Sequence, residues 1–292
     1  MLFGVQTFPT DYSIGPGEFA ALAEGFGFES VFFPEESHIP VGREIGTPVS
    51  SALPRAYFRT LDTVVAMTAA AGSTTTIKIG SAVATVAQRD PIQFAKEISS
   101  IDHLSVGRVI LGIGVGWSAE IMRNHGLDPS LAWHAMREKV LAMSAMWSEE
   151  EASYRGEIVS LDPIYMWPKP RQHPRPPILV GGYGPRVLER VLEYGDGWMP
   201  FRVEPDDPRA GSNEPEEFDA DLARRIADLH RRGDACGRGR LPVTLFNAKP
   251  QRDALRRYDD IGVARCIFHL PSVGPGEMEQ QLASLADVAG LK

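Results

Sequence analysis

Ser37 and His38 stand where proton-transfer chemistry is possible. They follow the apolar run 30–34, which has the composition of a buried strand. A histidine at the end of such a strand can donate or accept a proton near neutral pH. Glu35 and Glu36 come directly before them, but adjacent side chains diverge, so we do not expect these two carboxylates to act as a pair. We predict that His38 is the catalytic residue; the alternative is that it only braces the loop that follows.

A second candidate is LVGGYGPR, residues 179–186, which joins glycines to the expected start of a helix. The backbone N–H groups of Gly182 to Gly184 and the positive end of the helix dipole would face an anion there. Pro185 suits the first helical position, and Arg186 could add positive charge. The segment predicts a phosphate-binding turn, and the alternative is a plain strand-to-helix turn.

The run LGIGVG, residues 111–116, invites comparison with the dinucleotide-binding fingerprint, in which glycines let a pyrophosphate approach the backbone. Its spacing differs, because Trp117 stands where the third glycine belongs. Two interpretations stay open: close packing within a barrel, or a wall that faces a cofactor. Since no G-x-S-x-G, P-loop or H-E-x-x-H motif is present, the chemistry is expected to come largely from a cofactor.

Composition narrows the class of protein. The chain of 292 residues has a formal net charge of −8 and no clustered basic segment, so neither nucleic acid nor an anionic membrane surface is expected as a partner. Its two cysteines, Cys236 and Cys266, do not form a C-x-x-C pair, and no histidines have ligand spacing, so neither disulfides nor a metal site is predicted. No apolar run approaches the roughly 20 residues that span a bilayer. We expect a cytoplasmic enzyme that acts on a small molecule.

The strands and helices that must position the candidate site residues are clearest between Gly80 and Trp117. A strand at 77–86 is rich in β-branched residues, and Asp90 followed by Pro91 is typical of a helix start. Gly107 ends that helix, and the apolar run 109–115 indicates a parallel strand covered on both faces. The segment therefore predicts a strand, helix, strand unit with a right-handed crossover.

The rest of the chain alternates in the same way. Further strands are expected at residues 2–8, 30–34, 177–180, 197–200, 241–246 and 266–270. Helices are expected at residues 16–27, 58–71, 185–194, 216–232, 251–261 and 276–288. Eight parallel strands predict an α/β fold, a closed (β/α)8 TIM barrel that forms a single domain over residues 1–292.

Insertions are expected after strands 2 and 4. Residues 39–56 form a long loop, which at that length is expected to be functional. Residues 117–176 hold an extra helix at 131–147, a hairpin around 154–157 and a Pro-rich run. Residues 204–221 are acidic and contain Pro, Gly and Ser, the composition of a mobile loop or lid.

The chain resembles a known enzyme superfamily over nearly its whole length. The segments that carry the resemblance are RDPIQFAKEISSIDHLSVGRVILGIGVGW, WPKPRQHPRPPILVGG and EYGDGW. They are similar to the bacterial luciferase-like monooxygenases and, within them, to the coenzyme F420-dependent oxidoreductases. The resemblance implies a barrel that holds a flavin-like ring at its carboxyl mouth, and it implies a homodimer.

The resemblance also implies a set of site residues. Cofactor contacts are expected from Ser37, Ala82, Val83, Thr85, Gly116, Glu120, Gly181, Gly182, Tyr183, Gly184, Pro185 and Arg186. The run Gly80 to Val83 aligns with a bulge that in deazaflavin-binding relatives contains a non-prolyl cis peptide, here between Ala82 and Val83. The sugar-phosphate dehydrogenases of the family carry an acid where this chain has Trp117, so a flatter and more apolar substrate is expected.

Three functions are compatible with these expectations. The first is an oxidoreductase that transfers a hydride between coenzyme F420 and a small organic substrate, while the protein positions and protonates. The second is an FMN-dependent monooxygenase, for which residues 39–56 would serve as a closing lid. The third is a catalytically silent flavin-binding protein, because a fold alone does not guarantee turnover.

Overall fold

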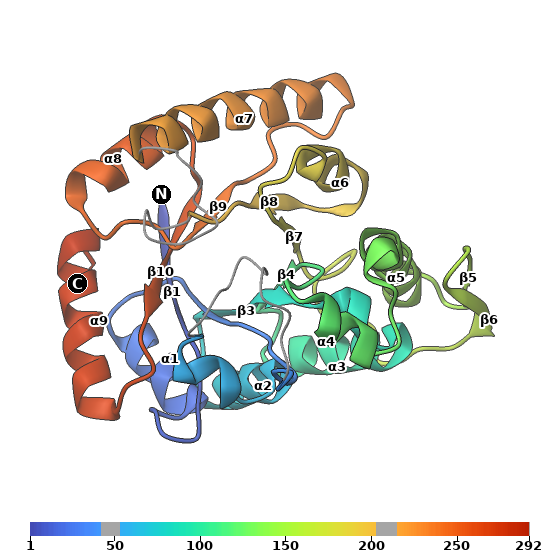
Figure 1. Ribbon diagram of the computed structural model, residues 1–292, viewed down its shortest axis with the longest axis horizontal. Helices are drawn as coiled ribbons and strands as arrows, with labels where there is room; N and C mark the ends of the chain where they lie inside the picture. Colours follow the sequence, from blue (N-terminus) through green and yellow to red (C-terminus); the bar gives the residue numbers. More distant parts are fainter. Residues whose placement is uncertain (42–52, 203–214, 292) are drawn as a thin grey trace.

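The computed structural model describes residues 1–41, 53–202 and 215–291, which form a barrel of parallel strands surrounded by helices (Figure 1). The strands form one eight-stranded sheet in the order β8-β7-β4-β3-β2-β1-β10-β9. They are β1 (Leu2–Thr7), β2 (Ser30–Phe33), β3 (Lys78–Ala84), β4 (Val109–Ile113), β7 (Ile178–Gly181), β8 (Gly197–Met199), β9 (Thr244–Phe246) and β10 (Arg265–Leu270). The order is that of a barrel in which the first strand lies beside the last.

Hydrogen bonds join the two ends of this sheet. The backbone N–H of Trp198 donates to the carbonyl of Pro242 at 3.0 Å, and that of Phe246 donates to the carbonyl of Pro200 at 2.8 Å. Parallel bridges at Trp198–Val243 and Phe201–Phe246 connect β8 to β9. The predicted barrel of eight parallel strands is therefore confirmed.

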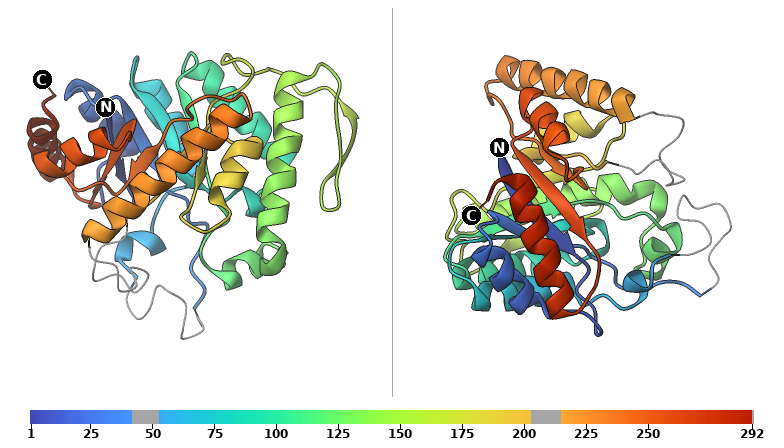
Figure 2. Two further views of the ribbon diagram at one scale, coloured as in Figure 1. Left: turned by 90° about the horizontal axis from the view of Figure 1, so that it is seen from above. Right: turned by 90° about the vertical axis from the view of Figure 1, so that its left-hand side faces the viewer.

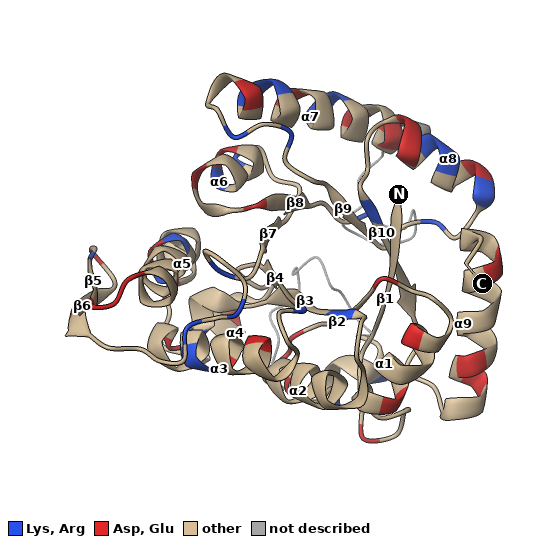
Figure 3. Ribbon diagram, turned by 180° about the vertical axis from the view of Figure 1, so that it is seen from behind, with Lys and Arg blue, Asp and Glu red and all other residues tan. Residues whose placement is uncertain are grey.

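Helices lie outside the barrel and cover the strands (Figures 1 and 2). They are α1 (Pro16–Gly25), α2 (Thr63–Ser73), α3 (Pro91–Leu104), α4 (Ala119–Asn124), α5 (Ala132–Ser148), α6 (Val187–Tyr194), α7 (Pro215–Ala235), α8 (Arg252–Asp260) and α9 (Pro275–Ala289). Charged residues of both signs follow the outer helices, most densely along α7 and α8, whereas the strands are almost free of them (Figure 3). Charge is therefore concentrated on the outer helices rather than on the strands.

The start of α2 and the presence of α4 differ from the sequence prediction. The helix expected at 58–71 begins at Thr63, because the carboxylate of Asp62 accepts the N–H groups of Val64 at 2.8 Å and Val65 at 3.0 Å. Residues Arg55–Phe58 form a separate 3-10 turn. The short helix α4 was not predicted; it starts where the hydroxyl of Ser118 caps it.

The predicted insertion after β4 holds α5 and an antiparallel hairpin of β5 (Ala152–Arg155) and β6 (Ser160–Ile164), at the edge of the molecule (Figure 2). Glu138 of α5 holds the hairpin turn. Its buried carboxylate accepts the N–H groups of Glu157, Ile158 and Val159, each at 2.8 Å. These bonds hold the pKa of Glu138 at about 2 against the opposing effect of burial.

The two loops expected to be functional fall largely outside the described residues. Residues 42–52 of the predicted lid 39–56 and residues 204–214 of the predicted loop 204–221 are not described. Across the described ranges, no helix is both long and apolar enough to cross a membrane.

Candidate functional site

A cavity of about 630 Å³ opens at the carboxyl ends of the strands. Every strand of the barrel contributes to its lining, either from its last residues or from the loop that follows. This is the end of a (β/α)8 barrel at which active sites lie, and the volume is ordinary for a small-molecule or cofactor site.

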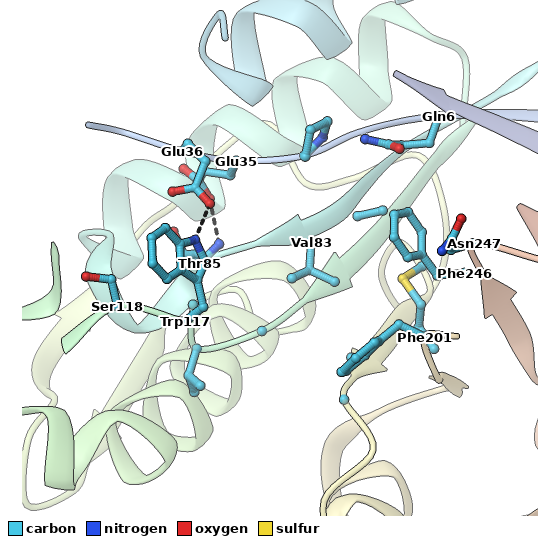
Figure 4. Close-up of a pocket in the computed structure, with 18 of the residues that line it drawn as sticks. Gln6, Glu35, Glu36, Val83, Thr85, Trp117, Ser118, Phe201, Phe246 and Asn247 are labelled. Carbon is cyan, nitrogen blue, oxygen red and sulfur yellow. Dashed lines mark hydrogen bonds between the residues drawn. The ribbon is translucent and has the colours of Figure 1, made fainter. Parts of the chain in front are cut away.

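The floor of the cavity is a bulge in β3. The register between β3 and β4 shifts between Ser81 and Ala84, and the Ala82–Val83 peptide is cis, as predicted. The side chain of Val83 lies at the centre of the cavity, between the Glu36 side and the Phe246 side (Figure 4). The bulge therefore moves one apolar side chain out of the strand and into the site.

Glycines on the neighbouring strands make room for Val83. A Cβ on Gly114 would lie 2.6 Å from its Cγ2, and one on Gly181 would lie 2.9 Å from its Cγ1. A Cβ on Gly112 would collide with the carbonyl oxygen of Ser81. Gly112 therefore allows close packing, as one interpretation of LGIGVG expects, while Gly114 and Gly116 line the cavity.

We expect Gly114→Ala to lower the free energy of unfolding by about 1 to 3 kcal/mol, because the new methyl group overlaps Val83 in a packed floor. It should also weaken binding of any ring that lies on that floor. Thermal unfolding and ligand titration would measure both effects. Gly72→Ala is the matched control, since a Cβ there meets no atom within 4 Å. Equal stability and affinity in the two variants would contradict this account of the floor.

The loop after β7 forms one wall of the cavity. Its hydrogen bonds contradict part of the prediction that residues 179–186 form a phosphate-binding turn. The N–H of Gly182 is not free, because it donates to the carbonyl of Met199 at 3.2 Å. Helix α6 begins at Val187 rather than at Pro185. The hydroxyl of Tyr183 donates to Asp221 at 2.9 Å, and burial together with this bond raises the pKa of Tyr183. Bonds to other parts of the protein therefore hold this loop in place.

The structure brings most of the predicted site residues together. Those that line the cavity are Ser37, Ala82, Val83, Thr85, Gly116, Gly181, Gly182, Tyr183 and Gly184. His38, Glu120, Pro185 and Arg186 are not among the lining residues.

His38 reaches the cavity only through Ser37. Its Nδ1 lies 2.9 Å from the Ser37 hydroxyl, and its Nε2 lies 2.8 Å from the amide nitrogen of Asn124. The same hydroxyl lies 2.8 Å from Nε2 of His125. Ser37 lines the cavity, so a proton could pass between its hydroxyl and the two imidazoles. A catalytic role for His38 would therefore act through Ser37.

Glu35 and Glu36 diverge, as predicted, into different surroundings. Glu35 is 7% exposed and pairs with Arg89, while its other oxygen accepts the N–H of Thr85 at 2.5 Å. Glu36 accepts the indole N–H of Trp117 inside the cavity (Figure 4). Burial raises the pKa of Glu36 to about 7; the Trp117 bond opposes that rise and the charge of Glu35 adds to it.

Sequence reasoning missed the lining residues from β1, β9 and β10. Gln6 and His269 lie on neighbouring strands, and Oε1 of Gln6 is hydrogen-bonded to Nδ1 of His269. Gln6 is fully buried, and its Nε2 has no partner among the described protein atoms. Burial within the barrel lowers the pKa of His269. A polar residue inside an otherwise apolar strand, as in LFGVQT and RCIFHL, was the available signal.

Apolar side chains complete this side of the cavity, namely Phe8, Tyr57, Met199, Phe201 and Phe246. Among the residues that the structure covers, no group of three or more His, Cys, Asp or Glu could hold a metal ion. The site therefore combines an apolar floor and wall with carboxyl, hydroxyl, amide and imidazole groups at its rim, which suits a flat organic ring and a small second molecule.

Comparison with known sequences finds relatives over most of this chain. Residues 16–231 match the luciferase-like monooxygenase family. A Mycobacterium tuberculosis protein of uncharacterised function is 37% identical over 276 residues, 93% of this chain and 92% of that protein. The F420-dependent glucose-6-phosphate dehydrogenase of Kineococcus radiotolerans is 28% identical over 185 residues, 62% of this chain and 50% of that enzyme.

Solved structures share the fold. The monooxygenase RslO1 of Streptomyces bottropensis has a TM-score of 0.74 and 17% identity, with 98% of each chain covered. The coenzyme F420-dependent tetrahydromethanopterin reductase of Methanopyrus kandleri has a TM-score of 0.72 and 15% identity, with 100% of this chain and 99% of that chain covered. At these identities the likeness concerns the fold alone.

Proposed function

Because the chain belongs to the luciferase-like monooxygenase family, we propose that it is an oxidoreductase that binds coenzyme F420 and transfers a hydride between this deazaflavin and a small organic substrate. One observation carries the proposal. The cavity at the catalytic end of the barrel has the side chain of Val83 as its floor, and Gly114 and Gly181 leave that floor open on both sides.

The residues present fit a flat ring. A Cβ at Gly114 or Gly181 would overlap the side chain of Val83, so the floor of the cavity depends on glycine at both positions. Ala82, Val83, Thr85 and Gly116 would hold the ring. Gly181, Gly182, Tyr183 and Gly184 would face its chain, with Glu120, Pro185 and Arg186 farther out, where Arg186 could meet phosphate charge.

When bound, a deazaflavin gives or takes a hydride, and the chain supplies the surroundings for that step. The apolar wall of Phe8, Phe201 and Phe246 excludes water from the substrate side. Ser37 lines the cavity, and its hydroxyl can exchange a proton with His38 or His125. His38 is thus proposed to act through Ser37.

The FMN-dependent monooxygenase is the second candidate. It is favoured by the likeness in fold to RslO1, which is named as a monooxygenase. Coenzyme F420 is favoured by the sequence relative named as F420-dependent and by the fold neighbour named in the same way. Both cofactors present a flat tricyclic ring, so their binding can be compared directly.

Separate titration of the purified apoprotein with F420 and with FMN tests this proposal. We expect saturable micromolar binding of F420, measured by the quenching of its fluorescence. We expect weaker binding of FMN. Gly114→Ala should weaken F420 binding, whereas Gly72→Ala, on the outer helix α2, should not. Micromolar binding of FMN without binding of F420 would refute the proposal and favour the monooxygenase.

A further inference from the structure

Two adjacent carboxyl groups in this site have opposite surroundings. Glu35 has a structural role, because it forms an ion pair with Arg89 and accepts the backbone N–H of Thr85. Among the residues that the structure describes, Glu36 forms no such ion pair, and it accepts a hydrogen bond from the neutral indole of Trp117. Carboxyl groups whose environments separate them in this way commonly divide into one that stays ionised and one that carries a proton.

Glu36 is placed to reach a bound molecule. It follows β2 at the carboxyl end of the barrel and lines the cavity with Ser37 and Trp117 (Figure 4). Trp117 follows β4, so its indole reaches Glu36 from a different strand, 81 positions away in sequence. This N–H fixes the direction of the carboxyl group at the wall of the cavity.

We propose that Glu36 is a catalytic proton donor and acceptor of this site, acting on the oxygen of a carbonyl substrate or of the corresponding alcohol, with Trp117 as its positioning residue. The inference rests on the proposed function, because it assigns the proton that must accompany the hydride. The apolar wall of Phe8, Phe201 and Phe246 points to a substrate with apolar substituents beside the carbonyl group.

The chemistry balances without a further reagent. In reduction, the new C–H bond at the carbonyl carbon would form from a hydride, two electrons and one proton, that a bound reduced deazaflavin would supply. The O–H bond of the Glu36 carboxyl group breaks, and its proton forms the alcohol O–H bond. The carboxylate then regains a proton from solvent. In oxidation each step runs in reverse, with Glu36 taking the hydroxyl proton.

The acidity of Glu36 supports this role. With its pKa raised to about 7, the side chain has both protonation states populated near neutral pH, the condition under which one group serves well as acid and base. The charged group that acts on it is Glu35, whose own charge is balanced by Arg89. The imidazoles of His38 and His125 lie beyond Ser37 on the same side.

The first test needs neither cofactor nor substrate. Infrared difference spectra of the apoprotein across neutral pH should show one protonated carboxyl band that disappears on deprotonation. Glu36→Gln should abolish this band, and Glu277→Gln on α9 should leave it unchanged. Trp117→Phe should move its midpoint to higher pH, because the indole N–H bond favours the charged carboxylate.

The second test uses the protein loaded with F420 and a ketone or alcohol that the wild type turns over. Glu36→Gln should lower kcat by about 10² to 10⁴, the usual value of general acid or base catalysis, with little change in F420 affinity. It should also remove the neutral limb of the pH profile, whereas Glu277→Gln should retain the profile.

The outcomes separate the two proposals. If no band assignable to Glu36 titrates near neutral pH, or if Glu36→Gln retains wild-type kcat, the assignment of Glu36 is overturned. If the protein fails to bind F420, the proposed function is refuted, while the infrared titration still decides the state of Glu36.

Discussion

Replacing Glu35 with alanine is expected to lower the free energy of unfolding by about 3 kcal/mol, because it removes one partner of a buried ion pair and leaves the other behind. Glu35 is 7% exposed and Arg89 is 19% exposed. The N–H of Thr85, bonded to Glu35 at 2.5 Å, would lose its partner in the same change. Arg89 keeps Asp62 and Glu97, which limits the loss to the lower end of the usual range.

Urea denaturation of the wild type and the variant would measure this difference. Glu97→Ala is the matched control, because it removes a weaker contact of the same guanidinium at 3.4 Å and should cost less than about 1 kcal/mol. Since Glu35 also fixes the backbone of Thr85 at the cavity, its loss should weaken cofactor binding. Equal costs for the two variants would show that Glu35 is not the main partner of Arg89.

Acidification is expected to remove roughly 3 kcal/mol of stability through Glu138 alone. Its folded-state pKa, about 2, lies below the ordinary value of 4.5. A depressed pKa stabilises the fold above the unfolded-state value, and this contribution is lost as the pH falls through the folded-state value. The stabilising bonds are those from the turn of the β5–β6 hairpin.

Glu138→Gln isolates this contribution, because the amide cannot ionise. The difference in free energy of unfolding between wild type and variant should be largest at neutral pH and should shrink as the pH falls towards about 2. Glu157→Gln, whose side chain is 86% exposed, should follow the wild type. Subtracting the curves removes the similar contribution of Glu24, whose pKa is also about 2. A difference that does not change with pH would contradict the assignment.

The barrel could be predicted from sequence because its signals are local. Asp90 followed by Pro91 does start α3, with the carboxylate accepting the N–H of Gln93 at 2.8 Å. Glycines and apolar runs likewise placed the strands, and the resemblance placed the cis peptide at Ala82–Val83. Helix α2 starts later than predicted because the side chain of Asp62 caps it, although apolar residues precede that cap.

The site could be predicted only in outline. The glycine turns and the β3 bulge leave a local trace in the sequence, and the structure places them on the cavity. Glu36 leaves none, because its acidity depends on burial and on an indole that is 81 positions away. Adjacency in sequence predicts that Glu35 and Glu36 diverge, but it does not indicate which partner each carboxyl group meets.

The neighbourhood of β1 and β10 has a consequence for how the protein is made. These strands pair from Leu2–Arg265 to Thr7–Leu270, and the bond between Gln6 and His269 joins residues 263 positions apart. At about 5 to 20 residues per second, a ribosome needs on the order of tens of seconds to synthesise the last strand after the first. During that time β1 has an unpaired edge, which other chains can join. The part of the cavity lined by Gln6 and His269 is therefore among the last to form. Until synthesis reaches β10, the newly made chain depends on protection of the unpaired edge of β1.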